Sequence, residues 1–278
     1  MSHESPPLAA VLGWPISHSK SPVLHGYWLK KYGITGYYIP IGVAPTDFEQ
    51  ALRSLPRLGF KGCNVTIPHK EKALTLADHV TDRAALIGAA NTINFGADGT
   101  ITADNTDGYG FLENLKQHAP SWNPASGPAL VLGAGGASRA VISALLSAGV
   151  PEVRLANRTR NRADMLAEAF GANVRVIDWN KISDAADGAV TVVNTTAMGM
   201  AGNKDVAMRF DAAPSNALVT DIVYTPLETG FLRDAKNHGL QTVDGLGMLL
   251  HQAAPGFERW FGTHPEVDDG LRQAVLSA

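Results

Sequence analysis

Cysteine is almost absent from this chain of 278 residues, because Cys63 is the only one. A single cysteine excludes an intramolecular disulfide and is typical of a reducing compartment. We expect Cys63 to be a small buried apolar side chain. The nine histidines are scattered and form no HExxH motif, and one cysteine cannot supply a zinc cluster. The sequence therefore predicts no metal site.

Neither a surplus of charge nor a long apolar run is present. The 23 Lys and Arg residues are balanced by 26 Asp and Glu residues, for a net charge of -3, which argues against nucleic acid or a membrane as a partner. The N-terminal residues show no basic segment followed by a long apolar one, and the apolar stretch 139–150 is too short to span a bilayer. GxSxG and GxxxxGK[ST] motifs are missing as well, which disfavours hydrolase and P-loop chemistry. We expect a soluble, cytoplasmic protein.

The first third of the chain alternates strand-like and helix-like segments, which is typical of an α/β fold. Pro22 is suited to the first turn of a helix, and Thr46–Glu49 has the pattern of a capping box for a helix to about Leu55. Another helix is expected after Pro68. The expected strands are 8–12, 37–43, 62–67, 91–95 and 99–103.

A loop at 117–128, rich in proline and serine, precedes a second α/β pattern. The expected order is a buried strand at 129–132, a glycine turn at 133–138, an apolar helix at 139–148 and a strand at 153–156. This order makes a complete βαβ unit. Further parallel strands are expected at 175–177, 189–194 and 218–222.

The glycine turn favours dinucleotide binding. Gly133 permits a tight turn, and Gly135 lets backbone N–H groups approach a pyrophosphate at the start of the helix. The third position of the fingerprint is Ser138, where glycine or alanine is usual. A turn that only joins a strand to a helix is the alternative, but the complete βαβ context favours the cofactor.

The end of the strand at 153–156 favours NADP over NAD. An NAD site would place a carboxylate there to accept from the ribose 2′-OH, whereas residues 157–162 contain three arginines and no carboxylate. Arg158 is the best candidate to bind a 2′-phosphate, with Thr159 and Arg162 beside it. Arg160 is more readily explained as a solvated residue at a helix start.

The first third also contains a set of polar residues suited to a hydroxylated small molecule. Ser17–Pro22 holds three serines, and Asn64 and Thr66 share one face of a strand. Lys70 suits proton transfer, and a nearby carboxylate such as Asp107 can orient it. These residues alone do not exclude that Lys70 is an ordinary surface lysine.

In order and spacing, these segments resemble the shikimate dehydrogenase family over almost the whole chain. The resemblance implies NADP-dependent, reversible reduction of 3-dehydroshikimate to shikimate in aromatic amino acid (chorismate) biosynthesis. It also implies an α/β fold of two lobes, an N-terminal substrate domain with a mostly parallel sheet and a Rossmann-type NADP domain, with the active site in the cleft between them. The matching segments are Gly13–Pro22, Asn64–Glu71, Gly88–Ile93, Asn105–Gly108, Gly133–Arg139, Asn157–Thr159, Asn194–Thr196, Asp244–Met248 and Gln252–Ala254.

The resemblance assigns a role to each matching residue. Lys70 and Asp107 match the catalytic acid–base pair, and both also contact substrate. Ser19 and Ser21, helped by Tyr224, match the residues that hold the substrate carboxylate. Contacts to the ring hydroxyls are matched by Thr66, Asn91, Asp107 and Gln252. The cofactor-binding residues are Gly133, Gly135, Gly136 and Ala137 at the pyrophosphate, Asn157, Arg158, Thr159 and Arg162 at the adenosine phosphate, and Thr195, Ile222, Gly245 and Met248 near the nicotinamide.

The resemblance also revises the domain boundaries. Composition alone would divide the chain at the 117–128 loop, whereas the family pattern gives 1–106 with 245–278 as the substrate domain and 107–244 as the NADP domain. The apolar stretch 253–261 is expected to pack within the chain, and a homodimer is an open alternative to a monomer.

Small departures from the family pattern keep alternatives open. Trp14, Ala90 and His69 stand where other residues are common, and His69 beside Lys70 could bear on the pKa of the lysine or on substrate preference. A relative of broader range that also oxidises quinate is one rival, and a non-catalytic regulator that binds NADP or shikimate is the other. Retention of both Lys70 and Asp107 argues against the regulator.

Overall fold

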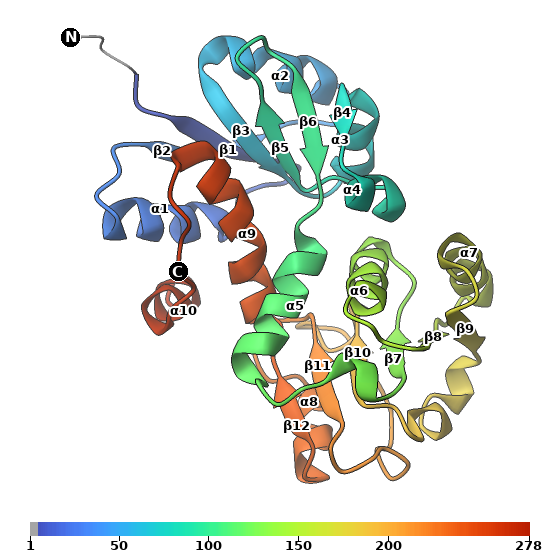
Figure 1. The fold of residues 1–278 in the computed structure, drawn as a ribbon. Coiled ribbons are helices and arrows are strands. Elements are labelled where there is room, and N and C mark those ends of the chain that lie inside the picture. Colours follow the sequence, from blue (N-terminus) through green and yellow to red (C-terminus); the bar gives the residue numbers. More distant parts are fainter. Residues whose placement is uncertain (1–4) are drawn as a thin grey trace. The chain divides into compact units, whose positions relative to one another are not determined.

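The structure, a computed structural model, describes residues 5–278, and the contacts within it divide the chain into two compact units. Unit 1 comprises Met1–Thr106 and Leu250–Ala278, and unit 2 comprises Asp107–Leu249. Each unit is built on its own six-stranded sheet (Figure 1).

Unit 1 has a mixed sheet in the strand order β2-β1-β3-β5-β6-β4. Strands β1, β2 and β3 pair in parallel, β5 is antiparallel to both β3 and β6, and β4 is parallel to β6. The strands are β1 (Leu8–Gly13), β2 (Tyr37–Gly42), β3 (Phe60–Val65), β4 (His79–Val80), β5 (Thr92–Phe95) and β6 (Ile101–Asp104). The helices are α1 (Ser21–Lys31), α2 (Phe48–Ser54), α3 (Lys70–Leu76), α4 (Asp82–Ile87), α9 (Leu246–Phe261) and α10 (Asp269–Leu276), with a 3-10 turn at Pro56–Leu58.

The core of unit 1 joins apolar side chains of its helices to those of its central strands. Phe48 and Leu52 of α2 and Leu76 of α3 are buried in one cluster with β1, β3 and Cys63. Cys63 is fully buried, as expected from the sequence. Helices α1 and α9 pack on each other through Trp28 and Phe257, whose rings are 5.2 Å apart.

The capping box expected at Thr46–Glu49 is wrong. Helix α2 begins at Phe48, so Asp47 occupies the cap position and makes no side-chain cap bond. Thr46 instead donates to the side chain of Asp47 at 3.1 Å. The local pattern is common at helix starts, but here the helix begins one residue later than the box requires.

Unit 2 has an entirely parallel sheet in the order β12-β11-β10-β7-β8-β9. Alternate residues of β7 face opposite sides, so Val131 packs with α5, α6 and α7 while Leu130 packs with α8. The strands are β7 (Ala129–Leu132), β8 (Val153–Ala156), β9 (Val174–Ile177), β10 (Thr191–Asn194), β11 (Leu218–Asp221) and β12 (Gln241–Val243). The helices are α5 (Asp107–His118), α6 (Gly136–Ser147), α7 (Arg160–Phe170) and α8 (Gly230–Asn237), with 3-10 turns at Pro124–Ser126, Trp179–Lys181 and Asp184–Ala186.

This order places the chain reversal next to β7, because β8 lies on one side of β7 and β10 on the other. In doubly wound sheets, ligands bind beyond the carboxyl ends of the strands at such a switch point. The glycine turn that follows β7 and the loops that follow β10 and β11 all lie at those strand ends. The fold therefore directs the search for a cofactor site to these loops.

Candidate active site

In unit 1, three polar residues lie in line across neighbouring strands. The register pairs Asn64 of β3 with Thr92 of β5, and Thr92 with Asp104 of β6. All three side chains are buried. Buried polar groups of this kind are retained where they bond to one another, and here they support the loops that carry the expected site residues.

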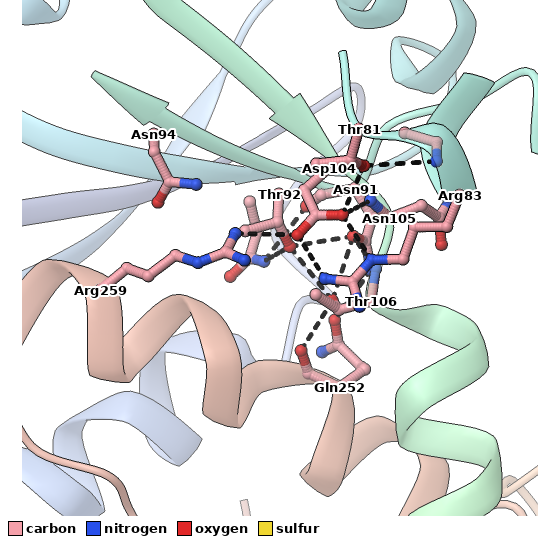
Figure 2. Close-up of polar contacts among 12 residues, drawn as sticks. Thr81, Arg83, Asn91, Thr92, Asn94, Asp104, Asn105, Thr106, Gln252 and Arg259 are labelled. Carbon is pink, nitrogen blue, oxygen red and sulfur yellow. Dashed lines mark hydrogen bonds and ion pairs between the residues drawn. The ribbon is translucent and has the colours of Figure 1, made fainter. Parts of the chain in front are cut away.

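Asn91 lies at the centre of this cluster, directly before β5 (Figure 2). Its Oδ1 accepts from the backbone N–H of Thr106 at 2.9 Å and from the hydroxyls of Thr106 and Thr92 at 3.1 and 2.9 Å. Its Nδ2 donates to Oε1 of Gln252 at 3.2 Å. The hydroxyl of Thr106 also lies 2.8 Å from the backbone carbonyl of Gln252, so its single proton is shared between this carbonyl and Oδ1 of Asn91. Asn91 and Gln252, both expected to contact substrate hydroxyls, are thus brought together.

Asp104 anchors the same cluster and was not among the expected site residues. Its fully buried carboxylate accepts from Thr81 at 2.8 Å, from Nε of Arg83 at 2.6 Å and from Nη1 of Arg259 at 2.8 Å, as Figure 2 shows. Burial by itself would raise the pKa of this carboxyl, but the hydrogen bonds from Arg83 and Thr81 and the positive charge of Arg83 outweigh it and hold the pKa well below its usual range. The one feature of the sequence that could have pointed to Asp104 is its position at the end of an expected strand, directly before Asn105.

The two serines expected at the substrate carboxylate lie at the start of α1. Ser21 is the first residue of the helix and is buried, and its backbone N–H bonds to Oγ of Ser19 at 3.3 Å. Thr66 directly follows β3, and its backbone N–H bonds to the carbonyl of Leu12 at 2.9 Å. These hydroxyls therefore lie beyond the carboxyl ends of the parallel strands β1 and β3.

Lys70 is the first residue of α3 and is half-buried. Its backbone carbonyl accepts from the N–H of Ala90 at 2.9 Å, which places Lys70 beside the segment that carries Asn91. Asp107 follows Thr106 directly in the chain and begins α5.

His69, next to Lys70, is part of the core. Its ring is buried and stacked on Phe48, with the centroids 4.2 Å apart and the planes 7° from parallel. Nε2 lies 2.8 Å from the carbonyl of Val43, and because a carbonyl only accepts, Nε2 carries the proton. The imidazole ring therefore fills a packing site in the core of unit 1.

In unit 2, the glycine turn has the geometry that a pyrophosphate requires. Gly133 has a φ of +110°, and a Cβ there would lie 2.7 Å from Oγ1 of Thr195. Gly135 and Gly136 are exposed, and a Cβ at either would meet nothing within 4 Å. Helix α6 begins at Gly136, so the unpaired N–H groups of its first turn and the positive end of its dipole face this open space.

Ser138, the departure from the usual fingerprint, ties this turn to the neighbouring strand. Its Oγ accepts from the N–H of Gly135 at 3.1 Å and lies 2.6 Å from Oγ1 of Thr195. The hydroxyl of Thr195 donates to the carbonyl of Leu132 at 2.7 Å, so Ser138 is the donor in the bond between the hydroxyls. The serine is thus fully bonded in a place where glycine or alanine would only pack.

The three arginines in the segment after β8 differ in whether they form ion pairs. Arg160 forms ion pairs with Asp178 and Asp164. Arg158 and Arg162 are exposed and form no ion pair among residues 5–278. Asn157 joins this segment to the glycine turn, because its side chain accepts from the N–H of Ala134 at 3.2 Å and donates to the carbonyl of Thr159 at 2.8 Å.

Two of the four residues expected near the nicotinamide line a pocket of about 310 Å³ in unit 2. Thr195 and Ile222 line it, together with Tyr224, whose hydroxyl has a pKa raised by burial. Gly245 approaches the end of β11 closely, since a Cβ there would lie 2.5 Å from the carbonyl group of Ile222. Met248 is half-buried in the part of α9 that belongs to unit 2. Sequence reasoning did not single out the remaining lining residues, Thr196, Ala197, Met200, Val223 and Thr225.

No helix within residues 5–278 combines the length and apolar character needed to cross a membrane. Over the same range, no group of three or more His, Cys, Asp or Glu side chains is arranged to hold a metal ion.

Comparison with known proteins finds relatives that cover 98% of this chain. The sequence pattern of the shikimate dehydrogenase substrate binding domain matches residues 11–93, that of shikimate / quinate 5-dehydrogenase matches 115–245, and that of the shikimate 5′-dehydrogenase C-terminal domain matches 245–276. The chain is 60% identical over 271 residues to the shikimate dehydrogenase (NADP(+)) of Paracoccus denitrificans, with 98% of this chain and 96% of the relative covered. It is 62% identical over 271 residues to the enzyme of the same name from Cereibacter sphaeroides, with 98% and 97% covered.

Solved structures give the same result. The shikimate 5-dehydrogenase of Thermus thermophilus in complex with NADP(H) and shikimate is 40% identical, with a TM-score of 0.86 and 97% of this chain and 98% of that chain covered. The quinate dehydrogenase of Corynebacterium glutamicum in complex with NAD is 32% identical, with a TM-score of 0.89 and 99% and 100% covered. This chain belongs to the shikimate dehydrogenase family.

Proposed function

We propose that this chain catalyses the reversible, NADPH-dependent reduction of 3-dehydroshikimate to shikimate in the cytoplasm. The observation that carries the proposal is the cluster at the strand ends of unit 1. There Asn91 bonds to Gln252, Lys70 lies beside the Asn91 segment, and Asp107 follows Thr106, which Asn91 holds. Relatives that are named shikimate dehydrogenase (NADP(+)) support it at 60% and 62% identity.

The proposed substrate is a hydroxylated acid, and the expected site residues include a partner for each of its groups. The hydroxyls of Ser19 and Ser21 would donate to the carboxylate, with Tyr224 as a further donor. Thr66 and Asp107 would contact the ring hydroxyls together with Asn91 and Gln252. Neutral amides and hydroxyls suit this task because each can donate and accept.

The residues of unit 2 fit NADP(H). Gly133 with Gly135, Gly136 and Ala137 would hold the pyrophosphate at the start of α6, where the turn is open. Arg158 and Arg162, with Asn157 and Thr159 beside them, would hold the 2′-phosphate. Two exposed guanidinium groups without a carboxylate partner in the described chain favour a phosphate over a bare ribose hydroxyl. Near the nicotinamide we place Thr195, Ile222, Gly245 and Met248.

When bound, NADPH supplies the hydride for the ketone carbon of the substrate. The task of the protein is to deliver a proton to the ketone oxygen as negative charge develops there. We assign this proton to the Nζ of Lys70, and we assign to Asp107 the role of orienting the ammonium group. Such acid–base assistance accounts for about 10²–10⁴ in rate. In the reverse direction Lys70 takes the proton from the hydroxyl.

Quinate is the second candidate substrate, because the quinate dehydrogenase of Corynebacterium glutamicum covers 99% of this chain with a TM-score of 0.89. That protein is in complex with NAD, whereas the arginines after β8 favour NADP in this chain. Shikimate with NADP is therefore the preferred pair.

Product analysis tests the proposal. Incubation with shikimate and NADP+ is expected to yield 3-dehydroshikimate and NADPH in equal amounts. Lys70→Ala is expected to lower kcat far more than it raises KM, because the lysine acts mainly in the transition state. A wild-type protein that binds NADP+ but yields no product would instead indicate the non-catalytic regulator. A large rise in KM with kcat intact would make Lys70 a binding residue.

A further inference from the structure

The pocket of about 310 Å³ in unit 2 has two walls, each formed by the segment that follows a strand. The first wall follows β10 and includes Thr195, Thr196 and Met200. The second wall follows β11 and includes Ile222 and Tyr224. The width of the pocket therefore depends on how the two strand ends are held.

The first wall is fixed by Asn194, the last residue of β10. Its Oδ1 accepts from the backbone N–H of Thr196 at 3.0 Å and from the hydroxyl of Thr196 at 2.7 Å. Its Nδ2 donates to the carbonyl of Met198 at 3.1 Å. One fully buried side chain thus determines the path of the segment that lines the pocket.

The second wall is fixed in the same way by Asp221, the last residue of β11. Its Oδ1 accepts from the backbone N–H of Val223 at 2.9 Å, and its Oδ2 accepts from the hydroxyl of Thr229 at 2.8 Å. Thr229 caps α8 by accepting from the N–H of Leu232 at 3.4 Å. Asp221 therefore fastens the second wall to the helix behind it.

The two side chains also bond to each other. Asn194 and Asp221 are paired in register, and Nδ2 of Asn194 donates to both carboxylate oxygens of Asp221, at 3.0 and 3.1 Å. A backbone bond of 3.0 Å from Ile222 to the carbonyl of Asn194 joins the same strand ends. Both side chains are fully buried and every polar atom of the pair is bonded, so a change at either one leaves a buried partner unsatisfied.

We propose that Asn194 and Asp221 are a pair of positioning residues that fix the spacing of the two walls and so align the nicotinamide end of the cofactor. The inference rests on the proposed function, because it takes Thr195 and Ile222 to border the nicotinamide. Neither residue of the pair lines the pocket, so both act through the segments that they hold.

The charge of Asp221 supports a role that depends on pH. Burial raises the pKa of this carboxyl to about 6, against the opposing effect of its hydrogen bonds from Val223, Asn194 and Thr229. A smaller part of this rise comes from the nearby carboxylate of Asp205, which accepts from the N–H of Gly230 at 3.1 Å. Protonation below about pH 6 turns one acceptor of the pair into a donor and weakens the link between the walls.

Three variants test the pair: Asp221→Asn, Asn194→Asp, and both exchanges together. The double exchange keeps one amide-to-carboxylate bond between the strand ends. We expect each single variant to lower kcat about tenfold or more, which corresponds to about 1.4 kcal/mol. The double exchange is expected to recover most of this loss. Thr229→Val is the comparison variant, because it removes one buried bond to Asp221 but leaves the link between the strand ends, so its loss of kcat should be smaller than that of either single exchange.

Binding of adenosine 2′,5′-bisphosphate separates alignment from general damage, because this probe fills only the adenosine end of the site. We expect its Kd to be unchanged in all variants, while the fluorescence of bound NADPH changes in the single ones. A double exchange no better than the single ones, or an equal loss of bisphosphate binding, would overturn the proposal. Wild-type protein that does not bind NADP+ at all would instead refute the proposed function.

The pH dependence of the wild-type protein provides a further test. With saturating NADP+ and shikimate, the kcat of the wild type is expected to change between pH 5 and 7. The Kd of adenosine 2′,5′-bisphosphate is measured over the same pH range for the wild type and for Asp221→Asn. The ratio of these two Kd values is expected to stay constant. If the single variants do not fold, the double exchange alone tests the pair, and a double variant that folds but has lost kcat about tenfold or more would overturn the proposal.

Discussion

The side chain of Asn91 donates to Oε1 of Gln252 at 3.2 Å, which joins two residues 161 positions apart in the chain. The same asparagine holds the backbone N–H of Thr106 at 2.9 Å. A single side chain thus connects the start of β5, helix α9 and the residue before Asp107. Asn91 and Gln252, which are both proposed to contact substrate, therefore also hold each other in place. Replacement of either residue should affect both the stability of the fold and the binding of substrate, but to different degrees.

Asn91→Ala should be costly to the fold, and Gln252→Ala should affect mainly the substrate. The first change leaves the N–H of Thr106 and the hydroxyl of Thr92 without their acceptor, which we expect to lower the free energy of unfolding by about 2–4 kcal/mol. The second removes one bond from a half-buried residue and should cost less than about 1.5 kcal/mol while it raises the KM for shikimate. Urea unfolding and initial rates measure the two effects. Equal stability losses in the two variants would contradict this view of the cluster.

Arg158→Ala should change the cofactor preference, and Arg160→Ala is its matched control. Loss of a charge-assisted contact to the 2′-phosphate is expected to lower kcat/KM for NADP+ by about 10- to 100-fold, with little effect on NAD+. Arg160 is already paired with Asp178 and Asp164, so its replacement should leave the ratio of the two cofactors nearly unchanged. The measurement is kcat/KM with each cofactor. A larger change in Arg160→Ala than in Arg158→Ala would reverse the assignment.

Asp104→Asn should destabilise the protein at neutral pH but not in acid. The pKa of Asp104 is held below its ordinary value of 3.8, so the ionised form stabilises the folded state above about pH 4 and this stabilisation is lost as the pH falls through the folded-state pKa. At pH 7 we expect the free energy of unfolding of Asp104→Asn to be about 1–3 kcal/mol below that of the wild type. The loss is limited to this range because Arg83 and Arg259 remain open to water. Unfolding by urea from pH 7 to pH 3 should show the difference from wild type shrinking. If the difference in the free energy of unfolding instead grows as the pH falls, the stabilising role given to the ionised Asp104 is wrong.

His69→Phe should be tolerated. The ring would keep its stacking on Phe48 and would lose only the bond to the carbonyl of Val43, a cost of about 1 kcal/mol. Since the imidazole is engaged in the core, kcat and the preference for shikimate over quinate should stay within about threefold of wild type. His69→Ala is the comparison, because it leaves a cavity and should cost more stability. A changed substrate preference in His69→Phe would show that the histidine acts on the site.

The regular parts of the fold were predictable where burial leaves a clear pattern. Strands β7 and β8 begin and end where the sequence predicts, because strands buried on both faces are short apolar runs. Strand β4 was not predicted, since two exposed residues at a sheet edge carry no periodicity. Helix α10 was missed as well, because its eight residues mix polar and apolar types next to the chain end.

The site was predictable in its motifs but not in its supports. The glycine turn and the arginines after β8 follow from local sequence, since their function depends on neighbouring residues. The role of Asp104 could not be read in this way, because its partner Arg259 lies 155 positions away. The link between Asn194 and Asp221 was hidden for the same reason, as it depends on the register of two strands. The roles given to Lys70 and Asp107 stay predictions.

Initial rates with shikimate and quinate, each paired with NADP+ and NAD+, test the central claim most directly. The account predicts that kcat/KM for shikimate with NADP+ exceeds each of the other three pairings by at least about tenfold, the effect of about 1.4 kcal/mol in the transition state. Equal or faster turnover with quinate, or with NAD+, would contradict it.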